Sequence, residues 1–218
     1  MDLEIQGKTA LITGASKGIG LAVAKGLAAE GCDVHLTSRT AADLETAKGI
    51  IEQAHGVAVS THALDLSVQG NVAKLAEAVG EVDILINNAG AIPGGDVASI
   101  EEAQWREAWD LKVFGYINMT RHYLAQMTAR GHGVIVNVIG LAGEKPAANY
   151  VAGSAGNASL MAFTRAIGGA SLDKGVRVLA VNPGPVETDR ITMLLKARAE
   201  AEFGDVSRWR ELTKVWPM

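Results

Sequence analysis

Several features that define other protein classes are scarce or absent in this 218-residue sequence. Cys32 is the only cysteine, so no internal disulfide can form, which suits a reducing compartment. Residues 1–6 are acidic and lack the apolar stretch of a secretory signal, and no apolar run approaches the length that crosses a bilayer. The net charge of −4 makes nucleic acid and anionic membranes poor partners. We therefore expect a cytoplasmic protein that binds neither nucleic acid nor membrane.

The composition is that of an ordinary globular protein. Apolar residues make up 48% of the chain and charged residues 20%. The length fits one domain with a sizeable core, so we expect residues 1–218 to form a single domain.

Short apolar runs alternate with amphipathic stretches along the chain. The expected strands are 9–13, 33–37, 57–63, 82–87, 133–138 and 176–181. The expected helices are 19–30, 41–54, 68–79, 100–130 (as one helix or a broken pair) and 149–172. Continuous Val/Ile/Leu runs separated by helices indicate a parallel sheet that is covered on both faces. We therefore predict an α/β fold with a doubly wound, Rossmann-type sheet.

A glycine-rich turn, residues 13–20, lies between the first expected strand and the first helix. Its glycines are Gly14, Gly18 and Gly20. Glycines at such a turn allow a tight bend, close approach of the backbone to a pyrophosphate, and close packing of helix on strand. The helix that follows presents free N–H groups and the positive end of its dipole to a phosphate. The turn therefore favours a dinucleotide-binding site.

The spacing of these glycines resembles that of the short-chain dehydrogenase/reductase family, and three later segments add to the resemblance. They are Asp65-Leu66, Asn87-Asn88-Ala89-Gly90 and the segment 182–188, in the family's order. The resemblance implies a nicotinamide dinucleotide cofactor, with no metal ion. The cofactor-binding residues that it implies are Gly14, Ser16, Lys17, Gly18, Ile19, Gly20, Asp65, Leu66, Asn88, Ala89, Gly90, Tyr150, Pro183, Gly184, Val186 and Thr188.

The end of the second expected strand decides between the two nicotinamide cofactors. An acidic residue there would bind the adenosine ribose hydroxyls and favour NAD(H), but Ser38 occupies that place and Arg39 follows. Arg39 and Lys17 would suit a 2′-phosphate, since arginine binds phosphate through a bidentate fork. We predict NADP(H) as the preferred cofactor, with NAD(H) as the alternative.

The catalytic positions depart from the family's Asn–Ser–Tyr–Lys set. The tyrosine is present as Tyr150, and the resemblance implies that its hydroxyl exchanges a proton with the substrate. The family's lysine is replaced by Ser154, its serine by Gly140 and its asparagine by Lys112.

Activation of Tyr150 near neutral pH requires a nearby cation. A free tyrosine has a pKa near 10, so lowering it to neutrality takes roughly 4 kcal/mol. Lys112 and Lys145 are the candidates for this cation. We predict a compensated exchange in which Lys112 supplies the cation and Ser154 leaves space for it and accepts a hydrogen bond. The alternative is that Lys112 is an exposed surface residue.

The predicted function is NADP(H)-dependent interconversion of a carbonyl and an alcohol, on a small molecule with apolar parts. The alternative is a catalytically inactive dinucleotide-binding sensor or structural subunit. We expect residues 189–218 to form a flap for the substrate, and the family's final helix and strand to be missing.

The expected helix 100–130 contains four aromatic residues: Trp105, Trp109, Phe114 and Tyr116. The family commonly pairs this helix and the helix of Tyr150 across a two-fold axis, so we expect a homodimer or homotetramer.

Overall fold

The computed structural model describes residues 3–213, except for the side chains of Arg190, Ala197 and Ala201. The chain divides into two compact units, Met1–Asn182 and Pro183–Met218. Each unit is described here by itself.

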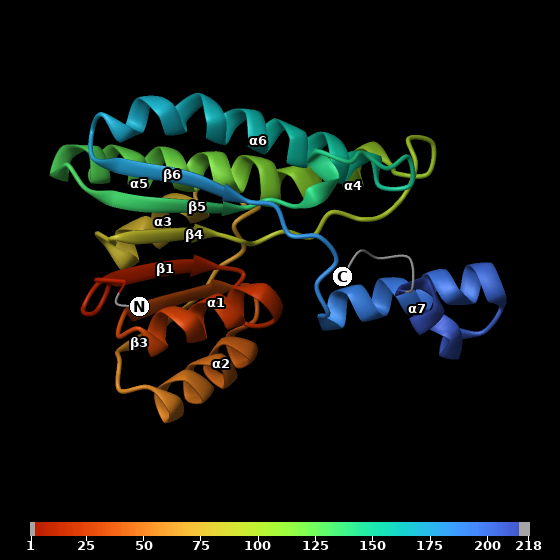
Figure 1. Cartoon of the computed structure of the whole chain (residues 1–218), viewed down its shortest axis with the longest axis horizontal. Coiled ribbons are helices and arrows are strands. Elements are labelled where there is room, and N and C mark those ends of the chain that lie inside the picture. The colour runs from red at the N-terminus through yellow and green to blue at the C-terminus, as the bar shows by residue number, and fades with distance from the viewer. Residues whose placement is uncertain (1–2, 214–218) are drawn as a thin grey trace. The chain divides into compact units, whose positions relative to one another are not determined.

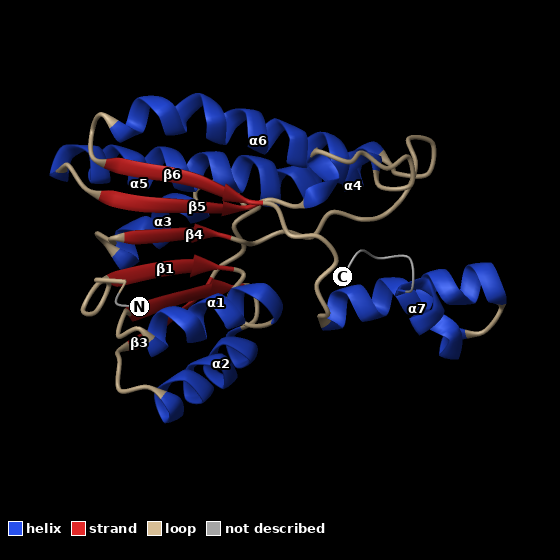
Figure 2. Cartoon of the chain, in the orientation of Figure 1, coloured by secondary structure: helices blue, strands red, loops and turns tan. Residues whose placement is uncertain are grey.

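The first unit is built on a six-stranded parallel sheet (Figures 1 and 2). The strand order is β3-β2-β1-β4-β5-β6. The strands are β1 (Thr9–Thr13), β2 (Asp33–Ser38), β3 (Val59–Ala63), β4 (Ile84–Asn87), β5 (Gly133–Val138) and β6 (Val176–Val181). The helices are α1 (Gly18–Ala29), α2 (Ala41–Ala54), α3 (Asn71–Val79), α4 (Glu102–Trp109), α5 (Gly115–Arg130) and α6 (Val151–Leu172). The predicted doubly wound sheet is confirmed.

Two apolar cores lie on opposite faces of the sheet. Successive side chains of a strand point to opposite faces, so Leu11 and Ile12 of β1 enter different cores. The core of Ile12 is closed by α1 and α2, which contribute Ala24 and Leu44 among others. The core of Leu11 is closed by α3 and α5, which contribute Leu75 and Tyr123 among others. Because both faces are covered, β1 is apolar over consecutive residues, as the sequence indicated.

Several element boundaries differ by one to three residues from those expected, among them the starts of α3 and β4. The helix expected from residue 68 begins at Asn71, because Asp65 first holds a turn: its Oδ1 accepts hydrogen bonds from the backbone N–H and the hydroxyl of Ser67. Gly70, with φ +86°, then redirects the chain into α3. The strand expected from residue 82 begins at Ile84, and Asp83 just before it bonds both neighbouring segments: its N–H donates to Thr9 and its carbonyl accepts the N–H of Val134.

The expected helix 100–130 is a continuous helical run with a change of winding. A π-helix, η1 (Asp110–Phe114), joins α4 to α5. Lys112 lies in the middle of η1. Short π-helical segments within α-helices frequently occur at functional sites.

The second unit contains α7 (Asp189–Phe203) and a 3₁₀-helix (Val206–Thr213). Leu195, Ala199 and Leu212 form its small apolar cluster. The predicted flap over residues 189–218 stays a prediction, and residues 214–218 lie outside the described residues. Within the described part of the chain, no helix has the length and apolarity needed to span a membrane. The cytoplasmic location stays a prediction.

Candidate functional site

The glycine-rich turn lies where β1 ends, at the edge to which all six parallel strands point (Figure 2). The N–H of Gly14 donates to the carbonyl of Thr37 at the end of β2, and Gly14 has φ +66°. A Cβ at Gly20 would overlap the carbonyl oxygen of Gly14. Glycine is therefore required at residue 20 so that the first turn of α1 can pack against the bend.

Asn88 and Ala89 hold the glycine turn in place. The Asn88 side-chain amide donates to the carbonyl oxygens of Thr13 and Gly14, at 3.0 and 3.1 Å. In return, the Thr13 hydroxyl accepts the backbone N–H groups of Asn88 and Ala89. The segment after β4 and the turn after β1 thus form one hydrogen-bonded unit.

Asn87 belongs to a buried polar network that the sequence did not indicate. Its Nδ2 donates to Thr120 of α5 at 3.1 Å and to Asn137 of β5 at 2.9 Å. Asn137 donates in turn to Thr164 of α6 at 2.9 Å. These residues are at most 4% exposed. The network fixes two helices to the middle of the sheet, which positions the loops at its edge.

Ser38 and Arg39 lie next to each other where β2 ends, in the part of the site that would bind the adenosine of the cofactor. The Ser38 hydroxyl oxygen is buried and has no hydrogen-bond partner, whereas the Arg39 side chain is exposed. Lys17 is also exposed and lies 4.0 Å from the Asp43 carboxylate. An exposed ion pair of this length is weak, so Lys17 can turn to another anion.

Asp65 and Leu66 follow β3 on the same edge. Burial alone would raise the pKa of Asp65, but hydrogen bonds from Ser67 and the charge of Arg39 lower it below its ordinary value. Leu66 is 7% exposed. A cavity of about 210 Å³ lies beside this pair, lined by Arg39, Ser67, Ala91, Pro93, Gln104, Glu107, Ala108 and Leu111. It combines apolar walls with a cation, a hydroxyl, an amide and a carboxylate.

These features fit an NADP(H) molecule. The glycine turn presents bare backbone where a pyrophosphate needs close approach. The same glycines also pack closely within the fold: a side chain at Gly14 would meet Ala89, and one at Gly20 would meet Gly14. Ser38 offers an unused hydroxyl, and Arg39 an exposed guanidinium, where a 2′-phosphate would bind.

Tyr150 lies immediately before α6 and is half-buried. Gly95, which follows the Asn88–Gly90 segment, forms a β-bridge with Tyr150. The N–H of Gly95 donates to Asn149, and the N–H of Val151 donates to Gly95. The Tyr150 ring lies over Gly153, where any Cβ would overlap its Cε1 and Cζ atoms. The tyrosine is thus tied to the segment that holds the glycine turn.

Lys112 points into the same edge. Its stem passes Gly90, where an added Cβ would stand 3.0 Å from the lysine Cδ. Its ammonium donates to the carbonyl of Ile139, the last residue before Gly140, and lies 6.0 Å from the Tyr116 ring centre. Lys112 is half-buried, so the alternative of an exposed surface lysine does not describe it.

Ser154 is 6% exposed, and its hydroxyl accepts the backbone N–H of Ala147 at 3.0 Å. It therefore fixes the loop that precedes Tyr150. Lys145, the other candidate cation, is exposed on this loop. Gly140 has φ +135°, a conformation that side chains rarely adopt.

The predicted nicotinamide-binding residues Pro183, Gly184, Val186 and Thr188 belong to the second unit. The Thr188 hydroxyl accepts the N–H of Ile191 and caps α7. Their contact with a cofactor stays a prediction.

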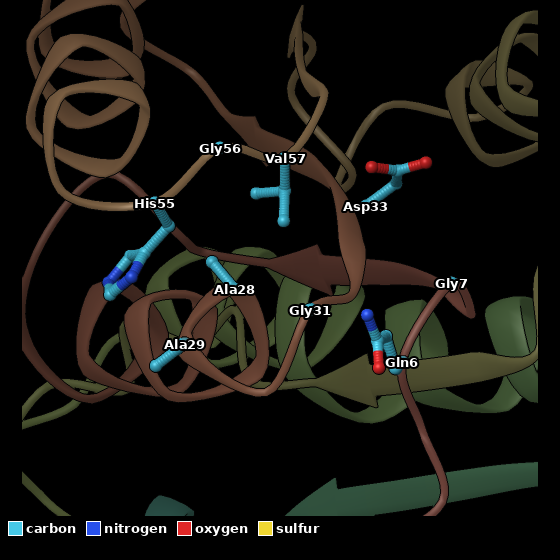
Figure 3. Close-up of a pocket in the computed structure, with 9 residues that line it drawn as sticks. All are labelled: Gln6, Gly7, Ala28, Ala29, Gly31, Asp33, His55, Gly56 and Val57. Carbon is cyan, nitrogen blue, oxygen red and sulfur yellow. The ribbon is translucent and has the colours of Figure 1, made fainter.

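A larger pocket, of about 420 Å³, lies at the opposite edge of the sheet (Figure 3). Its residues include Gln6 before β1, Asp33 at the start of β2 and Val57 before β3. Ligands of doubly wound sheets bind at the carboxyl ends of the strands. The pocket is therefore separate from the candidate site.

Comparisons with known proteins agree with this geometry. The family described as short chain dehydrogenase matches residues 8–199. The uncharacterized oxidoreductase YvrD of Bacillus subtilis is 32% identical over 94% of this chain and 78% of its own length. Galactitol 2-dehydrogenase (L-tagatose-forming) of Cereibacter sphaeroides is 33% identical over 97% of this chain and 82% of its own.

Among solved structures, L-sorbose reductase from Gluconobacter frateurii, complexed with NADPH and L-sorbose, superposes with a TM-score of 0.90. The two share 30% sequence identity, over 98% of this chain and 82% of the reductase. The family resemblance, the fold and the enzyme class that the sequence indicated are confirmed. The chain belongs to the short-chain dehydrogenase family and is an NAD(P)-dependent oxidoreductase.

Proposed function

We propose that this chain interconverts a carbonyl and an alcohol on a small molecule with apolar parts, using NADP(H), with Tyr150 as the proton donor and acceptor. The observations that support the proposal are the backbone bridge between Tyr150 and Gly95 and the packing of the Lys112 stem against Gly90, both next to the segment that holds the glycine turn.

The other two tyrosines are unsuited to proton exchange. Tyr116 is 1% exposed, and its hydroxyl donates to the carbonyl of Val138. Tyr123 is 0% exposed. Burial raises the pKa of both phenols far above the ordinary value. Tyr150 alone combines partial exposure with a place beside the cofactor-binding loops.

The proton chemistry follows from these positions. NADPH, when bound, supplies the hydride that adds to the carbonyl carbon of the substrate. Tyr150 gives its phenolic proton to the carbonyl oxygen and recovers a proton from solvent afterwards. The Lys112 ammonium stabilises the phenolate that remains. Ser154 holds the loop in front of Tyr150, and Arg39 with Ser38 selects the phosphorylated cofactor.

A two-part experiment tests the proposal. Calorimetric titration measures the binding of NADPH and of NADH, and NADPH oxidation is then followed with a panel of ketones, aldehydes and quinones. We expect tighter binding of NADPH and turnover of at least one carbonyl compound. Tight NADPH binding without turnover of any compound would contradict the proposed catalysis and favour a sensor.

A further inference from the structure

Asn157, in the second turn of α6, is a buried polar residue that the proposed chemistry has not used. It is 2% exposed, and its Oδ1 has no hydrogen-bond partner. Buried side-chain amides nearly always satisfy their hydrogen-bonding groups within the fold. The unpartnered Oδ1 can accept a hydrogen bond from a ligand, and the Nδ2 of the same amide is the group that can donate one.

The amide of Asn157 lies against Gly140. Its Nδ2 is 2.9 Å from the place where a Cβ of residue 140 would stand, and its Cγ is 3.7 Å from it. Any side chain at residue 140 would collide with the amide and would also strain a backbone with φ +135°. The space that a side chain at residue 140 would fill is thus occupied by the amide of Asn157.

The same place is where the other polar groups of the site meet. The Lys112 ammonium is bound to the carbonyl of Ile139, the neighbour of Gly140. Gly153, over which the Tyr150 ring lies, is one helical turn before Asn157 on the same face of α6. The cation and the amide therefore lie beside the residues that follow β5, and the Tyr150 ring lies one helical turn from the amide along α6.

We infer that Asn157 is a catalytic residue whose side-chain amide donates a hydrogen bond to the substrate's carbonyl oxygen, in place of the hydroxyl that Gly140 lacks. This inference rests on the proposed function. The carbonyl oxygen gains negative charge as hydride adds to the carbon, and a fixed N–H donor stabilises that charge more than it stabilises the ground state.

Two variants of Asn157 and one control test this role in kinetics. Asn157→Leu keeps the branched shape of the side chain and removes the donor, and Asn157→Asp keeps the shape and replaces the donor by an acceptor. We expect kcat/KM with NADPH and the best panel carbonyl to fall about 100-fold or more in both, with NADPH affinity unchanged. Ser171→Ala, which removes a buried hydroxyl from the far end of the same helix, should lower thermal stability and leave kcat/KM within about threefold.

A second measurement needs no turnover. The side-chain NH₂ signals of Asn157 in the NADP⁺ complex are assigned by their loss in Asn157→Asp, and acetophenone is added to form an unreactive ternary complex. A downfield shift of an Asn157 NH₂ proton, saturating with acetophenone, supports the inference. If wild-type turnover is absent, this shift still shows that Asn157 binds the carbonyl oxygen, and the proposed catalysis fails separately. An active wild type with an equally active Asn157→Leu, or unmoved NH₂ signals at saturating acetophenone, overturns it.

Discussion

Arg39 stands alone at the end of β2, exposed and beside a serine whose buried hydroxyl has no partner. Arg39→Asp should weaken NADP(H) binding by about 1.5–3 kcal/mol, because it removes one charged contact to the 2′-phosphate. NAD(H) lacks that phosphate, so its affinity for the same variant should change far less. Calorimetry with both cofactors on wild type and variant measures the difference. Equal binding of NADH and NADPH by the wild type would contradict the assignment.

Lys112 and Lys145 are the two lysines that the sequence offers as a cation for Tyr150. Lys112→Met should abolish turnover with an unchanged circular dichroism spectrum, because the half-buried ammonium at Ile139 would be lost. Lys145→Met is the matched control: its side chain is exposed on the loop before Tyr150, so activity should persist. The reverse pattern would move the cation to Lys145.

Residue identity at the site could be predicted only in part. The sequence alone predicted Tyr150, Lys112 and the glycines, because they lie at fixed spacings within motifs that resemble those of the family. Asn157 was not, because its significance depends on a contact with Gly140, 17 positions earlier, that only the packing of α6 on the end of β5 creates. The engagement of Ser154 with Ala147 depends likewise on the shape of a loop.

The element that binds the pyrophosphate, the turn from β1 into α1, offers a direct comparison of two glycines. Gly20→Ala should destabilise the protein by about 1–3 kcal/mol and weaken NADPH binding, because the added methyl overlaps the Gly14 carbonyl. Gly26→Ala, on the same helix with open space around it, should stabilise by about 0.5–1 kcal/mol. Urea unfolding and NADPH titration of both variants measure these effects. A neutral Gly20→Ala would show that the turn is looser than the structure indicates.

The pairing of β2 with β3 contains a histidine pair whose charge state affects stability. His35 Nδ1 and His62 Nε2 are 3.0 Å apart, and their rings stack. Burial lowers the pKa of both, and the neighbouring His62 lowers that of His35 further. The folded pKa values lie below the unfolded value of 6.5, so the unfolded chain binds protons first as the pH falls.

Stability should therefore be complete above about pH 6.5 and decrease as the pH falls below it. Urea unfolding at pH 7.5 and pH 5.5 measures the loss. His62→Gln should reduce the difference between the two pH values, whereas His55→Gln, at the end of α2, should not. An identical pH dependence in His62→Gln and wild type would exclude the pair as its source.

Strands and most helices were predictable because burial on both faces leaves an unmistakable run of apolar residues, as in β1 and β4. The start of α3 was not, because it depends on the hydrogen bonds that Asp65 makes in its turn. The π-helix around Lys112 spans five residues, Asp110–Phe114, which is too short to leave a periodic pattern of its own in the sequence.

At the scale of the whole molecule, the expected pairing with a second copy remains open to measurement. Of the aromatic residues that suggested it, Tyr116 is 1% exposed and packs within the chain's own core, whereas Phe114 is 50% exposed. We predict at least a dimer through η1, α5 and α6, with Phe114 at the interface. Light scattering at micromolar concentration should give twice the mass of one chain, and Phe114→Glu should halve it. A wild-type monomer would contradict the prediction.

The close approach of Asn157 to Gly140 has a consequence for how this sequence can change over evolutionary time. A serine at residue 140 alone would strike the amide, and loss of the amide alone would remove the N–H donor that we infer for the carbonyl oxygen. A substitution at either position alone is harmful while the other residue is unchanged. Residues 140 and 157 must therefore change together or not at all. Descendants of this chain should therefore keep both residues or exchange both, which makes the pair a marker of ancestry.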